Sequence, residues 1–174
     1  MKTKLTSAFI GTRVEIFKAL QLKTDIKFVV CEKRSRVYKY LKNKKIKKIL
    51  YSKKNKEKIF KILKTSKVNL ILSAGFPYII PKKFFDKKKI LINSHPSLLP
   101  KYKGIDAIND ALRNGEARIG VTVHYITKKI DSGKKIYQKS LYVKDLTKSQ
   151  IYNVIFSTLE PYVLLQSLKL IKKK

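Results

Sequence analysis

The chain has 174 residues, of which 44% are hydrophobic and 10% aromatic, a composition that fits one globular domain with its own core. Lys and Arg number 42 against 11 Asp and Glu, for a net charge of +31, and the single cysteine, Cys31, excludes a disulfide framework and a metal site built from cysteine pairs. No apolar run approaches the roughly 18–20 residues that cross a bilayer, so we expect a cytoplasmic protein with no membrane partner.

The first half of the chain predicts strands that alternate with helices. Short apolar runs predict buried strands at residues 5–10, 26–31, 68–73 and 90–93, and residues 46–51 fit a weak strand or a loop. Apolar residues at helical spacing predict helices at residues 14–22, 36–41 and 56–64. Alternating strands and helices indicate a parallel sheet that is covered on both faces.

The pattern changes after Gly120. Residues 121–126 and 136–143 alternate apolar and polar side chains, which predicts an antiparallel pair, and residues 149–170 predict a closing helix that Pro161 kinks or divides in two. The predicted fold class is therefore α/β. We expect a Rossmann-like, open, mostly parallel twisted sheet flanked by helices, with the antiparallel pair in the C-terminal half.

The densest group of chemically versatile residues begins where the strand at 90–93 ends. Asn93 and His95 are two residues apart, Pro96 and Pro100 stiffen the segment, and Gly104 ends it. In open α/β sheets ligands bind beyond the carboxyl ends of the strands. An isolated Asn-x-His pair is more often part of a turn, with its side chains hydrogen-bonded to the backbone. The choice between a turn and a functional site therefore depends on the residues that follow.

An ordered series of motifs continues the segment. Asn93-x-His95-Pro96-x-x-Leu99-Pro100 is followed by Gly104, by Gly120-Val121-Thr122-Val123-His124 and by Asp131-x-Gly133. The series resembles the catalytic domain of the folate-dependent formyltransferases, which act on glycinamide ribonucleotide, methionyl-tRNA and nucleotide-linked amino sugars. The resemblance is close from Leu70 to Val143. It implies one catalytic domain over residues 1–174, with 10-formyltetrahydrofolate as formyl donor and no metal.

The resemblance also implies the catalytic roles. Asn93 would donate a hydrogen bond to the oxyanion that forms when an amine attacks the formyl carbon. His95 would stabilise the same oxygen or move a proton toward the leaving nitrogen, and Asp131 would hold and charge His95. Taken alone, Asp131 fits a turn that Gly133 completes. Asn93 and His95 favour the catalytic interpretation.

The resemblance implies two further sets of residues. The folate would be held by the segment after the strand at 68–73 and by the stretch before Asp131, namely Phe76, Pro77, Tyr78, Ile79, Ile80, Lys128, Lys129 and Ile130. The acceptor would meet Gly11, Thr12, Arg13 and His124. For these residues a core-packed turn and a structural histidine remain the alternatives.

Departures from the family pattern bear on the acceptor. Glycinamide ribonucleotide enzymes carry a Gly-rich phosphate loop after the first strand, whereas the segment here holds a single glycine, Gly11, and resembles the amino-sugar and methionyl-tRNA enzymes. Methionyl-tRNA enzymes add a C-terminal domain that helps to hold tRNA, for which 174 residues leave no room. We therefore expect a small amine acceptor, a nucleotide-linked amino sugar, with glycinamide ribonucleotide or a methionyl-tRNA-like substrate as alternatives.

The charge leaves a non-enzyme alternative, a Lys-rich domain that binds nucleic acid. Only five of the 42 basic residues are arginine, and lysines are spread along almost the whole chain. Specific nucleic-acid contacts favour arginine forks gathered on one face, so nucleic acid is a less favoured partner. The missing Gly-rich fingerprint excludes a dinucleotide-dependent dehydrogenase. The sequence does not predict the oligomeric state.

Overall fold

The computed structural model describes residues 5–172, and its contacts divide the chain into two compact units, residues 1–92 and 93–174. Each unit is described by itself. The single catalytic domain expected from the sequence stays a prediction.

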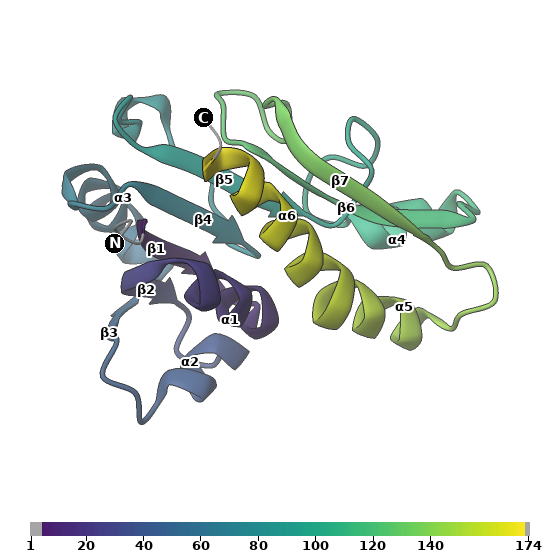
Figure 1. Ribbon diagram of the computed structural model, residues 1–174, viewed down its shortest axis with the longest axis horizontal. Coiled ribbons are helices and arrows are strands. Elements are labelled where there is room, and N and C mark those ends of the chain that lie inside the picture. Colours follow the sequence, from purple (N-terminus) through teal and green to yellow (C-terminus); the bar gives the residue numbers. More distant parts are fainter. Residues whose placement is uncertain (1–4, 173–174) are drawn as a thin grey trace. The chain divides into compact units, whose positions relative to one another are not determined.

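The first unit is built on a parallel sheet (Figure 1). Its strands lie in the order β3-β2-β1-β4, with the bounds β1 Thr6–Gly11, β2 Asp25–Cys31, β3 Lys47–Leu50 and β4 Leu70–Ala74. Every residue of β4 is buried, as expected of a strand covered on both faces. The edge strand β3 begins with Lys47 and Lys48, and charges of this kind protect an open edge from further pairing.

Helices connect the parallel strands of this unit. They are α1 Val14–Lys23, α2 Arg36–Leu41 and α3 Lys56–Thr65, with short 3-10 turns η1 Lys53–Asn55 and η2 Lys82–Phe84. Right-handed crossovers place α1 and α2 on one face of the sheet and α3 on the other (Figure 1). Ser35 caps α2 by accepting a hydrogen bond from the Tyr38 N–H.

The second unit begins within β5 Ile90–His95 and continues through α4 Ala107–Arg113 to the antiparallel pair β6 Arg118–Tyr125 and β7 Lys135–Tyr142. β6 lies between β5 and β7. Gly120 lies on β6 where a Cβ atom would come within 2.5 Å of the Lys139 carbonyl oxygen and within 2.4 Å of the Leu98 side chain, so only glycine fits there. This close approach brings the loop after β5 against the antiparallel pair.

The C-terminal helix is continuous but not uniform. It runs as α5 Lys148–Val154, the π-helical turn η3 Ile155–Leu159 and α6 Glu160–Lys172. Pro161 follows the π-helical turn, so it marks an irregularity within the helix rather than a break in two. The segment Lys148–Ile171 is long and apolar enough to cross a membrane by length and composition, which the sequence analysis did not anticipate. In this structure it packs on β6 and β7 as a core helix (Figure 1).

The predicted fold class is confirmed: parallel pairing in the first unit, an antiparallel pair near the C-terminus, and flanking helices. All of the predicted strands and helices are present, with ends displaced by at most a few residues. The helix α4 and the turns η1 and η2 were not predicted, and the two turns, of three residues each, are too short to show a period.

Candidate functional site

β5 places the Asn-x-His pair. Side chains alternate across a strand, so Asn93 and His95 face one side and Ser94, between them, faces the other. The Ser94 hydroxyl donates to the Glu160 Oε1 at 2.7 Å, a buried hydrogen bond that ties β5 to the first residue of α6. The strand that carries the two candidate residues is therefore held from its opposite face.

Asp131 lies at the centre of the cluster and accepts from several directions. Its Oδ1 is 3.3 Å from the Asn93 Nδ2 and 3.4 Å from the His124 Nε2. Its Oδ2 is 3.4 Å from the His95 Nδ1 and accepts the Gly104 N–H at 2.9 Å. The structure thus brings together the three predicted catalytic residues, and it adds His124, which was expected beside the acceptor.

The cluster is largely withdrawn from solvent. His95 is 4% exposed and His124 is 2% exposed, while Asn93 is half-buried. Desolvation raises the pKa of the Asp131 carboxyl, but hydrogen bonds from His124 and Gly104 and the charges of His95 and His124 outweigh it, so the pKa lies below its ordinary value. Asp131 is therefore a carboxylate at neutral pH, facing two imidazole rings.

His95 is held by a partner on each ring nitrogen. Its Nε2 lies 2.7 Å from the Tyr102 carbonyl oxygen, and its Nδ1 faces Asp131. Tyr102 adopts a positive φ of 54°, an uncommon backbone conformation for a residue other than glycine. A carbonyl oxygen can only accept a hydrogen bond, so the His95 Nε2 carries a proton. A second proton, on Nδ1, would be donated to the Asp131 carboxylate.

His124 has a different arrangement. Its Nδ1 faces the Tyr125 carbonyl oxygen at 2.9 Å, so this nitrogen carries a proton. Its Nε2 lies 3.3 Å from the Asn93 Nδ2 and 3.4 Å from the Asp131 Oδ1. A neutral ring accepts from Asn93 at this position, and a protonated ring donates to Asp131.

The loop that follows β5 is anchored by one hydroxyl. Thr122, fully buried on β6, donates to the Ser97 carbonyl at 2.7 Å and accepts from the Leu99 N–H at 3.2 Å and from Gln138 at 2.6 Å. The Asp131 loop is fixed by close packing, because a Cβ on Gly133 would lie 1.7 Å from the Tyr125 carbonyl oxygen. Both loops that reach the cluster are therefore constrained by specific contacts.

The predicted acceptor segment Gly11–Arg13 lies at the carboxyl end of β1. Gly11 has φ of 145°, and a Cβ there would stand 1.9 Å from the Ala74 carbonyl oxygen at the end of β4. The Thr12 N–H donates to this carbonyl at 3.1 Å. Within the first unit, the acceptor segment and the start of the predicted folate segment therefore adjoin each other.

The predicted folate residues divide into two groups. In the first unit, the half-buried rings of Phe76 and Tyr78 lie 5.5 Å apart, Pro77 and Ile79 are exposed, and Ile80 is buried in the core. In the second unit, Lys128, Lys129 and Ile130 are exposed on the loop that leads to Asp131. The apolar and aromatic surface after β4 suits a flat ring system.

Sequence reasoning missed two contributors, Tyr51 and Tyr102, and it named Gly104 only as a motif residue without a contact to Asp131. Tyr51 follows β3, and its ring lies 5.0 Å from Phe76 and 5.9 Å from Tyr78. Burial, with Glu32, Tyr78 and Cys31 nearby, raises the pKa of Tyr51 to about 12, so the phenol stays protonated. Tyr102 and Gly104 act through backbone groups, and only Gly104, placed after a Pro-containing loop, left a signal in the sequence.

Metal binding has no support in the described part of the chain: among residues 5–172 no three His, Cys, Asp or Glu side chains are arranged to hold an ion.

Comparison with known proteins gives a consistent result. A family model described as formyl transferase matches residues 11–168. Methionyl-tRNA formyltransferase of Borreliella afzelii is 34% identical over 118 residues, which cover 67% of this chain and 38% of that protein. The chain thus spans well under half the length of this curated relative.

Solved structures share the fold. Phosphoribosylglycinamide formyltransferase from Anaplasma phagocytophilum superposes with a TM-score of 0.82 at 27% identity, over 99% of this chain and 88% of that one. A formyltetrahydrofolate deformylase from Pseudomonas syringae shares the fold alone, with a TM-score of 0.80 at 18% identity over 98% and 62% of the two chains. Because the family model matches most of its length, the chain belongs to the formyl transferase family.

Proposed function

We propose that this protein transfers the formyl group of 10-formyltetrahydrofolate to the primary amine of a small acceptor, a nucleotide-linked amino sugar, in the cytoplasm. The observation that supports the transfer chemistry best is the shared carboxylate: Asp131 contacts Asn93, His95 and His124 within 3.4 Å. One amide donor and two imidazoles around an ionised carboxylate provide what the reaction needs.

In the proposed step the amine nitrogen attacks the formyl carbon and a carbon–nitrogen bond forms. Negative charge develops on the formyl oxygen and positive charge on the attacking nitrogen. A proton then passes from that nitrogen to N10 of the folate, the bond between N10 and the formyl carbon breaks, and tetrahydrofolate and a formamide leave. The protein must therefore stabilise an oxyanion and assist one proton transfer.

Asn93 is the proposed oxyanion donor, since it is the more exposed member of the Asn-x-His pair. Its NH₂ group has two hydrogens, and in this structure they face Asp131 and His124. In the reaction the formyl oxygen would replace the His124 Nε2 as the acceptor of one Asn93 N–H. We infer that His124 acts on the reaction through Asn93 rather than by touching the acceptor.

His95 is the proposed proton carrier. Asp131 faces its Nδ1, and Tyr102 orients the ring through Nε2. Long contacts of 3.4 Å are typical of catalytic groups without substrate, which shorten when the reacting groups are bound. A carboxylate at this distance stabilises the imidazolium that accepts a proton during the step.

The donor is proposed to use the segment Phe76–Ile80 together with Lys128, Lys129 and Ile130, and the acceptor to use Gly11–Arg13. The single glycine of this last segment supports an amino-sugar acceptor over glycinamide ribonucleotide. The relatives are named for two other acceptors, glycinamide ribonucleotide and methionyl-tRNA, so both remain alternatives to be tested.

An acceptor screen tests the proposal. The protein is mixed with 10-formyltetrahydrofolate and either a nucleoside-diphosphate amino sugar, glycinamide ribonucleotide or methionyl-tRNA, and folate release is followed by absorbance. We expect turnover with the amino sugar and loss of it in Asn93→Ala. Faster turnover with either other acceptor corrects the acceptor assignment, and no acceptor-dependent turnover with any amine overturns the proposed function.

A further inference from the structure

A groove of about 410 Å³ lies in the first unit. It opens between the starts of β2 and β3, the end of α3 and the segment before β4. Lys27 and Lys47 lie near the starts of their strands, and Val68 precedes β4. In a parallel sheet these amino ends lie at the edge opposite to the carboxyl ends, where Gly11 and Gly75 lie. The groove is thus remote from the proposed acceptor and folate segments of this unit.

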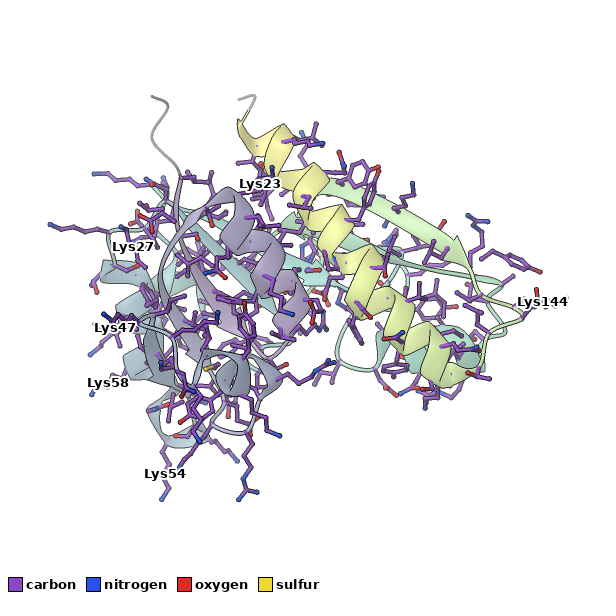
Figure 2. All side chains as sticks on the ribbon, turned by 60° about the horizontal axis from the view of Figure 1, so that its bottom comes forward. Lys23, Lys27, Lys47, Lys54, Lys58 and Lys144 are labelled. Atoms are coloured by element: carbon purple, nitrogen blue, oxygen red, sulfur yellow. The ribbon has the colours of Figure 1, made fainter. Side chains whose placement is uncertain are left out.

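Three lysines from distant parts of the sequence rim the groove: Lys27, Lys47 and Lys67. Lys27 pairs with Asp25 at 2.5 Å. No side-chain hydrogen bond or ion pair joins Lys47 or Lys67 to another residue within the described range 5–172. Figure 2 shows Lys27 and Lys47 extending outward from this unit. Two ammonium groups at the rim therefore lack an anion.

The carbonyl groups at the end of α3 do not supply that counter-charge. The Lys61 and Leu63 carbonyls accept the hydroxyls of Thr65 and Ser66, at 3.0 and 2.9 Å. The Ser66 N–H bonds the Ile62 carbonyl, and Lys89 donates to the Lys64 carbonyl. These groups supply hydrogen-bond donors to carbonyls in the last turn of α3. Lys47 and Lys67 are therefore not needed to cap the helix.

The inside of the groove is apolar. Phe28 and Val68 are 6% and 5% exposed, and Ile49 and Ile62 are half-buried. An apolar interior with a few charged groups at the rim is the usual composition of a small-molecule site. A ligand that fills it needs a flat or apolar body and an anionic group at one end.

The surroundings strengthen the attraction for anions. Residues 1–92 contain 27 Lys and Arg against five Asp and Glu, so +22 of the total charge of +31 belongs to this unit. A field of one sign raises the local concentration of an oppositely charged ligand. Charge alone does not select a ligand, but the apolar interior together with the three lysines at its rim adds selectivity.

We propose that this groove is a second ligand site, which binds a phosphorylated aromatic metabolite of mononucleotide size, with the ring on Phe28, Ile49 and Ile62 and the phosphate on Lys27, Lys47 and Lys67. A volume of about 410 Å³ lies within the range typical of small-molecule pockets. Binding here does not depend on formyl transfer.

The experiment is a titration of the full chain with AMP, by calorimetry and by amide NMR, with adenosine and inorganic phosphate as partial ligands. We expect AMP to bind more tightly than either part, and the amides of Phe28, Ile49 and Val68 to shift. The double variant Lys47→Gln/Lys67→Gln should weaken AMP binding by about tenfold or more. Thermal unfolding of each variant checks that the fold is retained.

The matched control is Lys54→Gln/Lys58→Gln, which removes the same charge from exposed lysines of this unit outside the groove (Figure 2). We expect it to change AMP affinity by less than about twofold. Equal losses in both double variants would show diffuse electrostatic attraction and overturn the proposal. Tight binding of adenosine alone, or no AMP binding, would overturn it as well.

A further variant separates this site from the proposed acceptor segment, which could also hold a nucleotide. Arg13→Gln should leave AMP binding in the groove unchanged. If AMP binding is lost in Arg13→Gln but kept in Lys47→Gln/Lys67→Gln, the nucleotide occupies the acceptor segment and the groove proposal fails, while the proposed function stands.

Discussion

Replacement of Asp131 by asparagine tests the proposed chemistry with little change in shape. Both carboxylate oxygens now accept: Oδ1 faces Asn93 and His124, and Oδ2 faces His95 and the Gly104 N–H. Asparagine replaces one acceptor with a donor. Its NH₂ group would oppose the Gly104 N–H in one orientation and the Asn93 NH₂ in the other, so the variant loses at least one contact as well as the charge.

The charge is the larger effect. A carboxylate and an imidazolium 3.4 Å apart attract each other by about 5 kcal/mol at an effective dielectric constant of about 20. Partial solvent access and the remaining amide dipole reduce this, and we expect a loss of about 3–4 kcal/mol of transition-state stabilisation, or about 10²–10³ in rate. Folate affinity should change little, because the pair acts on charge that arises only during the reaction.

The assay is single-turnover formyl transfer across pH 6–9, with folate affinity measured separately. His95→Asn serves as the companion variant, and the loss in the double variant should be far smaller than the sum of the single losses, because the two residues act as a unit. Transfer by Asp131→Asn at near the parent rate would show that Asp131 is only a turn residue.

Asp131→Asn should also change how the free energy of unfolding depends on pH. The folded-state pKa of Asp131 lies below its ordinary value of 3.8, so the carboxylate stabilises the fold above that pH. The contribution is lost as the pH falls through the folded pKa. In urea unfolding between about pH 2 and 4, the free energy of unfolding should fall more steeply for the parent protein than for Asp131→Asn.

Three further predictions concern the surroundings of the site. Thr122→Val removes the hydroxyl that hydrogen-bonds to Ser97, Leu99 and Gln138. In urea denaturation it should lower the free energy of unfolding by about 3 kcal/mol. The control Thr127→Val, at an exposed threonine, should lower it by less than about 1 kcal/mol. Gly133→Ala forces a Cβ to within 1.7 Å of the Tyr125 carbonyl oxygen and should abolish turnover by displacing the Asp131 loop. Gly104→Ala meets no atom within 4 Å but strains a backbone with φ of 93°, so it should lower turnover by less than Gly133→Ala. Lys87→Gln/Lys88→Gln, which changes two exposed lysines, should leave the transfer rate to a small acceptor within about twofold of the parent; a large loss would show that surface charge takes part in the reaction.

The sequence predicted best those features that depend on local periodicity. The apolar runs of β1 and β4 are buried almost throughout, and β2 is buried from Phe28 to Cys31, so each run is nearly continuous in the sequence. The helix α4 was not predicted because two of its three buried residues, Ala107 and Ala111, are alanines, which mark an apolar face only weakly.

The contact of Asp131 with His95 was expected from the resemblance, but the contact of His124 with the same carboxylate was not. Asn93 and His95 are fixed by the alternation of one strand, which a sequence displays. That His124 shares Asp131 with His95 depends on how β6 and the 126–134 loop meet, which no local pattern encodes. Lys89 shows the same limit: it stands in a run of three lysines, yet its side chain is 7% exposed and paired with Asp86 at 3.0 Å.

The most direct test of formyl transfer follows the formyl carbon itself. The protein is given 10-formyltetrahydrofolate labelled with ¹³C in the formyl group, together with the best acceptor of the screen, and the products are quantified by NMR and mass spectrometry. The proposed function predicts one labelled formamide on the acceptor amine for each tetrahydrofolate released, and loss of both in His95→Asn. Labelled formate released at the same rate with and without the acceptor would show hydrolysis in place of transfer and would contradict it.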